Sequence, residues 1–227
     1  MLFKTFFVQL LLFSKLVNGI SVISARRLQE LDDTFETGNA EESLFTKSVT
    51  KCGTKCSMNR RCVSFFFNTL THMCILHSDP FTYTVRTKSA PGWRFYITQE
   101  RTGRCPLGYI FYKQLDLCYK FRPTVQALDI SCPFGELLRI DSEVKQNYIM
   151  KVTDDIGLVY DNSICIQGIN TGDGWTYSDG TPMTYFRWGT GQPKKSSAKR
   201  LRMIRNSNYN WSITSDTKTC SYLCEYR

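Results

Sequence analysis

Ten cysteines fall into two groups along a chain of 227 residues. The first group comprises Cys52, Cys56, Cys62 and Cys74, and the second comprises Cys105, Cys118, Cys132, Cys165, Cys220 and Cys224. Each group has an even number of members, so each can close into disulfides within its own domain. Cysteines at this density are typical of secreted proteins, because the cytosol keeps thiols reduced. The pattern predicts two separately cross-linked domains without a free thiol.

Residues 1–19 have the features of a secretory signal peptide. Lys4 gives the segment a positive start, residues 6–13 are apolar except for one glutamine, and residues 17–19 offer a cleavage signal. Elsewhere no run approaches the roughly 20 apolar residues that cross a bilayer. We therefore expect a secreted, extracellular chain that starts near Ile20 and has no membrane span.

The first cysteine group lies in a pattern that predicts a helix on a small antiparallel sheet. Cys52 and Cys56 are four residues apart, on one face of an expected helix over 49–59. Three runs rich in aromatic and β-branched residues are expected strands: 62–68, 73–77 and 93–97. A polar segment, 99–104, follows as a plausible linker.

Four short motifs make residues 25–98 resemble a PAN/apple domain. They are KCGTKC at 51–56, RCVSF at 61–65, CIL at 74–76 and GWRFY at 92–96. The resemblance implies the disulfides Cys52–Cys74 and Cys56–Cys62. The extra pair that joins the ends of a full apple domain is absent, so this is the four-cysteine PAN type. PAN domains are protein- or carbohydrate-binding modules, which implies a binding role.

The second cysteine group begins with an aromatic hairpin over 105–121. Residues 125–132 are expected to begin a helix that Gly135 ends, and residues 137–140 are an expected short strand. Ser142 is a predicted cap for a helix over 143–150, because its hydroxyl can accept a bond from the first turn. A further strand is expected over 201–204.

Three motifs make residues 105–227 resemble a C-type lectin-like domain of the long form: WTYSDGTP at 175–182, GQP at 191–193 and LCE at 223–225. The predicted fold class is therefore α+β, with a PAN/apple-like domain followed by a C-type lectin-like domain of two helices, antiparallel sheets and a long loop. The family pattern implies the disulfides Cys105–Cys118 and Cys132–Cys224. Cys165–Cys220 remains as the third pair, and it departs from the family pattern.

In sugar-binding members of that family, calcium is held by oxygen ligands from Glu-Pro-Asn or Gln-Pro-Asp and from a later Trp-Asn-Asp. Here the loop has Gln192, which still offers a carbonyl oxygen, but Lys194 puts a cation at the next ligand position. Ser212 and Ile213 replace the ligands of the strand. The nearest carboxylates are Asp173, Asp179 and Asp216. We expect no calcium cofactor at the usual sugar site, and no other cofactor.

Six cations occur within twelve residues without an acid among them: Lys194, Lys195, Lys199, Arg200, Arg202 and Arg205. The whole chain has a formal net charge of +9. A local cationic surface attracts polyanions such as sulfated glycans. The same charges could instead be a solvated loop that keeps the protein soluble, and the sequence leaves both possibilities open. Nucleic acid is not an expected partner, since no nucleic-acid-binding module is present.

Other residues give no sign of catalysis. His72 and His77 lie five apart and would face opposite sides of a strand, so they cannot form a metal pair. No nucleophile–histidine motif occurs, and we expect the protein not to be an enzyme. Trp175, Trp188 and Trp211 are expected core residues, and Asn210 begins the glycosylation sequon Asn-Trp-Ser.

Two functions are compatible with the sequence. The first is a secreted recognition protein that binds extracellular glycans or proteins without the usual calcium-dependent sugar site. The second is a structural or adhesion component of the extracellular matrix with no small-ligand site.

Overall fold

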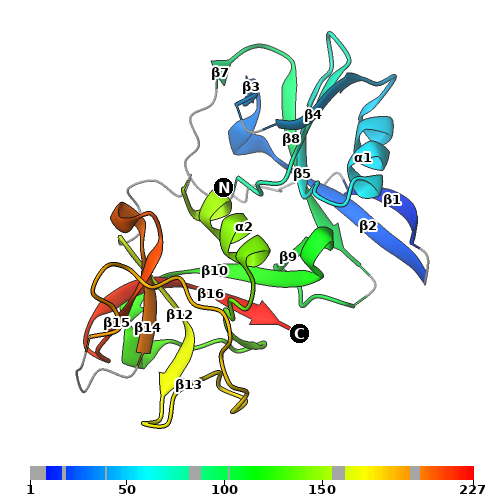
Figure 1. Ribbon diagram of the computed structural model, residues 1–227. Helices are drawn as coiled ribbons and strands as arrows, with labels where there is room; N and C mark the ends of the chain where they lie inside the picture. Colours follow the sequence, from blue (N-terminus) through cyan, green and yellow to red (C-terminus); the bar gives the residue numbers. More distant parts are fainter. Residues whose placement is uncertain are drawn as a thin grey trace, which may run out of the picture. The chain divides into compact units, whose positions relative to one another are not determined.

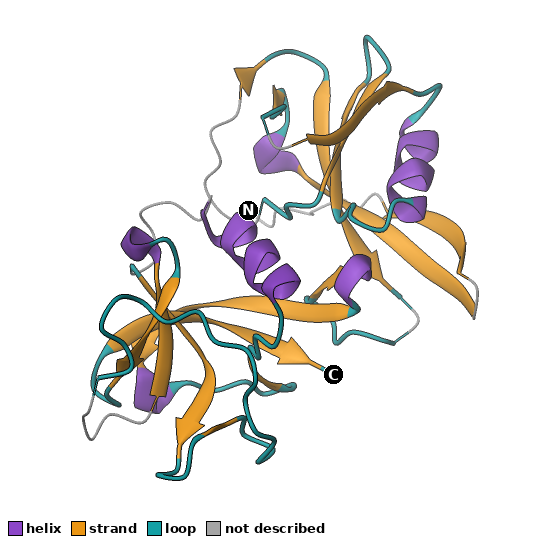
Figure 2. Ribbon diagram, viewed as in Figure 1, coloured by secondary structure: helices purple, strands orange, loops and turns teal. Residues whose placement is uncertain are grey.

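The computed structural model describes residues 9–16, 19–38, 40–81, 88–101, 103–154, 162–194 and 200–227. The chain divides into two compact units, Met1–Cys118 and Tyr119–Arg227. Strands predominate in both units (Figure 2). No helix among the described residues is long and apolar enough to cross a membrane.

The first unit is built on an antiparallel sheet with the strand order β1-β2-β8-β5-β6-β4 (Figure 1). These strands are β1 (Gln9–Leu16), β2 (Gly19–Leu28), β8 (Trp93–Glu100), β5 (Ser64–Asn68), β6 (Met73–His77) and β4 (Ala40–Phe45). The short strands β3 (Thr34–Phe35) and β7 (Lys88–Ser89) pair separately, and η1 (Gln29–Leu31) is a 3-10 turn. Of the expected signal peptide, residues 1–8 and 17–18 lie outside the described residues.

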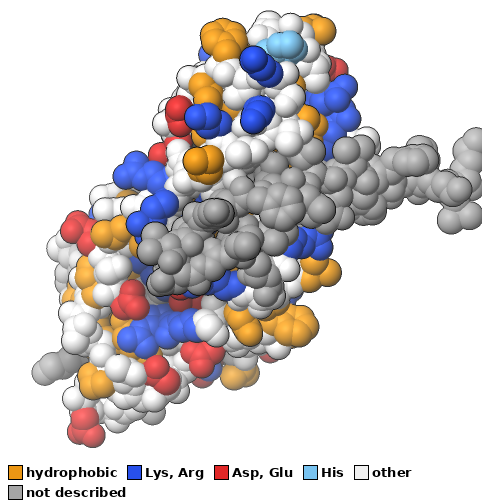
Figure 3. Space-filling view, turned by 90° about the vertical axis from the view of Figure 1, so that its right-hand side faces the viewer, with side chains coloured by type: hydrophobic (Ala, Val, Ile, Leu, Met, Phe, Trp, Pro, Cys, Tyr) orange, Lys and Arg blue, Asp and Glu red, His pale blue; other side chains and the backbone are white. Residues whose placement is uncertain are grey.

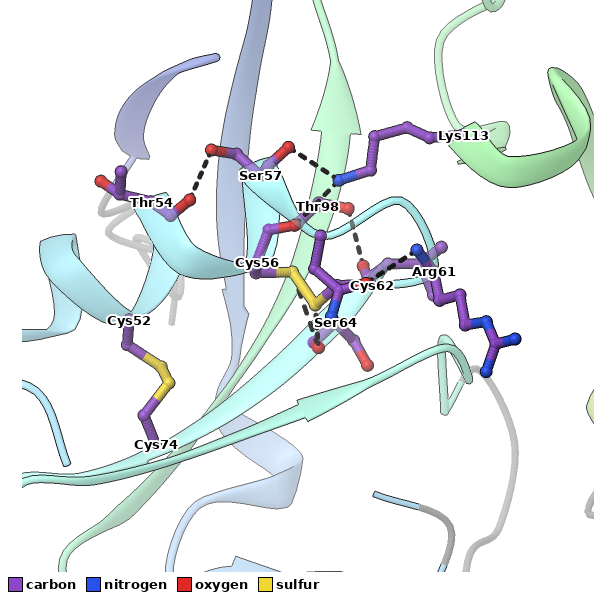
Figure 4. The surroundings of a disulfide bond; sticks show 12 residues. Cys52, Thr54, Cys56, Ser57, Arg61, Cys62, Ser64, Cys74, Thr98 and Lys113 are labelled. Atoms are coloured by element: carbon purple, nitrogen blue, oxygen red, sulfur yellow. Dashed lines mark hydrogen bonds between the residues drawn. A yellow bond between two sulfur atoms is a disulfide. The ribbon is translucent and has the colours of Figure 1, made fainter. Parts of the chain in front are cut away.

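Helix α1 (Val49–Met58) is cross-linked to this sheet as the cysteine spacing predicts. Ser48 caps the helix by accepting a hydrogen bond from the backbone N–H of Lys51. Cys52 is bonded to Cys74 on β6, and Cys56 is bonded to Cys62 just before β5 (Figure 4). All four cysteines are fully buried. The helix therefore covers the sheet with its cysteine face inward.

The core under the helix is aromatic. Phe65 and Tyr96 stack with ring centroids 5.0 Å apart, on the neighbouring strands β5 and β8. On the opposite face of the sheet, Phe66 packs on Phe95 with centroids 4.8 Å apart. Strand β8 continues to Glu100, so the first two residues of the expected linker are part of the sheet.

The hairpin that follows remains in the first unit. It contains β9 (Ile110–Tyr112) and the 3-10 turn η2 (Lys113–Leu115), and Cys105–Cys118 closes it. The Lys113 ammonium donates hydrogen bonds to the carbonyl oxygens of Cys56 at 2.8 Å and Ser57 at 3.0 Å (Figure 4). These carbonyls belong to the last turn of α1, where backbone carbonyls lack helical partners. The ammonium donates hydrogen bonds to them, and its positive charge interacts favourably with the helix dipole. Burial lowers the pKa of Lys113 to about 7.

The second unit is centred on a sheet with the order β15-β14-β12-β16-β10-β9, where β11 lies beside β16 and β13 beside β12. Its strands are β10 (Leu117–Gln126), β11 (Glu136–Leu137), β12 (Ser163–Asn170), β13 (Trp175–Thr176), β14 (Arg200–Ile204), β15 (Asn210–Thr214) and β16 (Thr219–Tyr226). Its helical elements are η3 (Ala127–Asp129), α2 (Glu143–Asp154) and η5 (Arg205–Ser207). Ser142 caps α2 through the backbone N–H of Lys145, as expected.

The helix expected over 125–132 is wrong: β10 extends to Gln126 and only η3 is helical. Pro123 favours extended backbone at the residue before it, and Val125 is β-branched. The N–H groups of Ala127 and Leu128 bond to the carbonyls of Lys218 at 2.9 Å and Asp216 at 3.0 Å. These bonds to a distant segment hold the backbone of residues 127 and 128 beside residues 216–218.

The last strand, β16, carries the links that close the second unit. Cys132–Cys224 and Cys165–Cys220 join it to the segment after η3 and to β12. The Glu225 carboxylate accepts two 2.8 Å hydrogen bonds from the buried ammonium of Lys145 on α2. Glu225 also accepts a hydrogen bond from the backbone N–H of Arg139 at 3.0 Å. The carboxylate of the terminal Leu-Cys-Glu motif is therefore a structural anchor.

We predict a pH-dependent stability that comes from Lys113. Its unfolded pKa is about 10.4, whereas its folded pKa is about 7, so between these values the unfolded chain binds one more proton. The free energy of unfolding therefore rises with pH in this window, by up to about 1.4 kcal/mol per pH unit.

Urea unfolding of the chain and of Lys113→Met at pH 7.5 and 9.5 measures the difference. The control Lys51→Met, an exposed lysine of α1, should keep the slope. Equal slopes in the chain and in Lys113→Met would contradict the prediction.

We also predict that Lys145→Met destabilises the second unit by about 3 kcal/mol, because removing one partner leaves a buried charge unpaired. The side chains of Lys145 and Glu225 are 9% and 7% exposed. The double variant Lys145→Met/Glu225→Gln should cost less than the sum of the single changes. Arg227→Gln removes a 42% exposed partner of the same carboxylate and should cost less than about 1 kcal/mol. Thermal unfolding of the parent, the two single variants, the double variant and Arg227→Gln tests this order, and additive effects would refute the coupling.

Candidate functional site

The long loop of the second unit contains Gln192, Pro193 and Lys194, where the sequence predicts that the usual calcium ligands are lost. The Gln192–Pro193 peptide bond is cis. The Gln192 side-chain oxygen accepts the backbone N–H of Lys194 and of Ile213, both at 3.4 Å. Lys194 itself is exposed. The one remaining amide oxygen of the motif is therefore already bonded to the backbone of the loop and of β15.

The two ligand positions on β15, Ser212 and Ile213, also offer no free ligand for calcium. The Ser212 hydroxyl accepts a hydrogen bond from Arg202 Nε at 3.2 Å, and Ile213 has no ligand atom. Gln192, Lys194, Ser212 and Ile213 thus supply no carboxylate. No cluster of three or more His, Cys, Asp or Glu side chains that could hold a metal ion occurs in the described ranges.

The nearest carboxylates have local partners. Asp179 accepts the backbone N–H of Thr181 at 2.8 Å and pairs with Arg139 at 3.2 Å. Hydrogen bonds from the side chain and the backbone of Thr181 lower the pKa of Asp179. Asp216 forms an ion pair with Arg200. Asp179 thus stabilises the turn that contains Thr181, and Asp216 pairs with an arginine of β14.

Strand β14 brings several of the predicted cations together. Arg200 and Arg202 alternate with the fully buried Leu201 and Met203, so the two arginines lie on the outer face of the strand. Arg205 follows in η5. We call Arg200, Arg202 and Arg205 the basic strand. Lys195 and Lys199 lie outside the described residues.

Neighbouring side chains hold the guanidinium groups of β14, and only Arg200 is paired with an acid, Asp216. The Arg202 guanidinium bonds to the hydroxyls of Ser212 and Ser163, each at 3.2 Å. On the face drawn in Figure 3, basic side chains are interspersed with acidic ones. The +9 net charge of the chain is therefore not gathered into one continuous surface on that face.

Sequence reasoning missed Arg187. Its Nε donates to the Asn210 side-chain oxygen at 3.3 Å, and its backbone carbonyl accepts the N–H of Trp211 at 2.6 Å. Both polar side chains of the Asn210-Trp211-Ser212 sequon are thus bonded to arginines. No signal in the sequence connects residue 187 with the sequon, because the pairing depends on how the loop returns to β15.

The three tryptophans differ in burial. Trp211 is fully buried, and its Nε1 donates to Gln146 of α2 at 2.9 Å. Trp175 and Trp188 are half-buried, with ring centroids 5.5 Å apart. The prediction of core positions is therefore correct for Trp211 and only partly correct for the other two.

The two histidines of the first unit do not form a pair. His77 is buried on β6 with Nε2 3.1 Å from the Glu36 carbonyl oxygen, while His72 is exposed in the turn before the strand. His77 is also enclosed by the rings of Phe66 and Phe81. These contacts are those of a core histidine.

Residues 27–96 match the family model for the PAN domain. No curated protein sequence matches the chain. Among solved structures, human lithostathine is 17% identical, covering 57% of this chain and 96% of its own length with a TM-score of 0.46. The C-type lectin CEL-I from Cucumaria echinata is 20% identical, covering 53% and 96% with a TM-score of 0.42. The mouse scavenger receptor C-type lectin carbohydrate-recognition domain is 22% identical, covering 54% and 96% with a TM-score of 0.44. Fold similarity at such identities transfers no ligand and no activity.

Proposed function

We propose that this protein is a secreted recognition protein that binds anionic extracellular glycans or glycoproteins, without calcium, through the basic strand and Lys194. The observation that carries the proposal is the outward alternation of Arg200 and Arg202 on β14. The exposed Lys194 precedes that strand in the sequence, as do Lys195 and Lys199, which lie outside the described residues. Together with Arg205 they are the six cations of the sequence pattern.

The ion pair between Arg200 and Asp216 does not prevent a polyanion from binding to Arg200. Arg200 and Asp216 have side chains that are 36% and 56% exposed, and exposed pairs contribute only about 0–1 kcal/mol. A polyanion engages several cations at once, so its combined interactions can displace such weak pairs. The attraction decreases as salt screens the charges.

Calcium has no evident role in this binding. The oxygen of Gln192 is bonded to two backbone N–H groups, and a hard divalent cation requires several oxygen ligands. An ammonium at Lys194 would repel the ion. The donor set therefore does not fit calcium, which supports a binding mode based on cationic side chains.

The likeness of residues 27–96 to PAN domains supports a second binding module in the same chain. Two binding modules in tandem raise the overall affinity for a ligand that both can reach. The other function compatible with the sequence, a structural or adhesion component, is an outcome of the tests below.

We predict that chelating calcium leaves glycan binding unchanged. The purified protein is applied to a glycan array that contains sulfated, acidic and neutral glycans, once with calcium and once with a chelator. Binding to anionic glycans should be equal in the two conditions. Chelator-sensitive binding of a neutral monosaccharide would refute the proposal, and binding to no glycan would favour the structural or adhesion component.

We predict that a sulfated polysaccharide column retains the protein at low salt and releases it as salt increases. Changing Lys194, Lys195, Lys199 and Arg200 to glutamine should lower the affinity roughly tenfold or more, since each exposed ion pair contributes about 0.2–1 kcal/mol. The salt concentration at elution measures the effect, and an unchanged melting temperature shows that the variant is folded.

The matched control removes four exposed cations from the first unit: Lys47, Lys51, Lys55 and Arg60. It changes the net charge by the same amount and should elute close to the parent protein. If both variants lose retention equally, net charge alone is responsible. If neither variant loses retention, the basic strand is only a solvated face.

A further inference from the structure

A cavity of about 280 Å³ opens on the second unit, away from the residues of the calcium motif. It is lined by parts of β11, β12 and β14, including Glu136, Ile166, Gln167, Gly168, Arg200 and Leu201. Ligand pockets are usually about 300–1,000 Å³. The volume therefore suits a small molecule or a single side chain, and it is too small to enclose an oligosaccharide.

A bulge in β12 shapes the cavity. Ile166 pairs with Leu201 of β14, but the next pair is Ile169 with Arg200, so Gln167 and Gly168 are skipped in the ladder. At Gly168 the backbone φ is +151°, and a Cβ there would lie 2.3 Å from Leu201 Cδ1. Bulges and strand glycines often mark places where a strand is shaped around a site.

The cavity combines an apolar part with one fixed carboxylate. Ile166 and Leu201 are 2% and 0% exposed and supply the apolar surface. Gln167, only 4% exposed, donates from Nε2 to Glu136 Oε2 at 2.8 Å and to the Leu137 carbonyl at 2.8 Å. The Ser178 hydroxyl donates to the same Glu136 oxygen at 3.1 Å. Two neighbours thus hold the carboxylate in place.

The charges of the cavity are not balanced. Glu136 is exposed. Among the described residues it forms no ion pair, and only its Oε2 accepts hydrogen bonds. Arg200, which also lines the cavity, is paired with Asp216. The uncompensated charge at this site is therefore negative, in contrast to the positive charge of the basic strand.

We propose that this cavity binds a primary ammonium group carried on a short apolar chain. The ammonium pairs with Glu136 Oε1, which Gln167 and Ser178 orient through the other oxygen. The apolar chain contacts Ile166 and Leu201. A free alkylamine and the lysine side chain of a partner protein share this chemistry. The cavity shares Arg200 with the anion-binding surface proposed above, but the contacts proposed for the ammonium group do not involve Arg200 and do not depend on that surface.

Three probes of similar size and different charge test the proposal: hexylammonium, hexanol and hexanoate. Their affinities are measured with the full chain from chemical-shift changes of the Gly168 amide. We expect hexylammonium to bind about fivefold more tightly than hexanol, the gain of one partly exposed ion pair, and hexanoate to bind most weakly. Nα-acetyl-lysine methylamide separates the two sources: affinity equal to that of hexylammonium indicates a protein lysine, and weaker affinity indicates a free amine.

Glu136→Gln should remove the preference for hexylammonium while it keeps an oxygen for Gln167 and Ser178. The control Glu143→Gln removes an exposed acid of α2 that does not line the cavity and should leave the preference intact. Equal binding of hexylammonium and hexanol, tighter binding of hexanoate, or no effect of Glu136→Gln would each overturn the proposal. So would the absence of binding by all three probes.

Discussion

The buried ion pair between Lys145 and Glu225 is the contact on which the second unit depends most. It joins α2 to the end of β16, and the same carboxylate accepts a backbone hydrogen bond from Arg139. Burial lowers the pKa of Lys145, and the opposing attraction of Glu225 favours its charged form. Next to this pair, a Cβ at Gly135 would lie 2.1 Å from the Glu225 carbonyl oxygen, so the backbones approach closely there. A buried charge pair is stable only when its groups have further hydrogen bonds, and here the backbone N–H of Arg139 and the Arg227 guanidinium donate to the same carboxylate.

The position of β16 in turn determines where the candidate sites lie. Strand β12 pairs in parallel with β16 and antiparallel with β14. The pairing of β12 with β16 and the Cys165–Cys220 disulfide determine the position of β12. The pairing of β12 with β14 then determines on which face of the sheet Arg200 and Arg202 lie. One residue of slip in this ladder would bury both arginines and expose Leu201 and Met203, since neighbouring side chains face opposite sides. The burial of two apolar side chains therefore keeps the arginines on the surface.

The second unit has two chemically different surfaces within one sheet. The basic strand offers half-buried cations on the outer face of β14, which suits extended anionic ligands. The cavity at the β12 bulge instead offers one oriented carboxylate beside apolar side chains, which suits a small cation. Arg200 belongs to both surfaces, and its ion pair with Asp216 reduces its charge toward the cavity. The same residue can thus attract polyanions outside without excluding an ammonium group inside.

The sequence by itself determined the features that depend on residue type and local period. The spacing of Cys52 and Cys56 predicted their common helix face, and the run at 73–77 matches β6 (Met73–His77). Only the tertiary structure decided that residues 125–132 are not a helix, that Arg187 reaches Asn210, and that Glu136 lies beside a cavity. Each of these depends on a partner far away in the sequence, such as the carbonyls of Asp216 and Lys218 that bond to the η3 segment. Local propensity is a fraction of a kcal/mol per residue, so a single long-range hydrogen bond or packed contact outweighs it.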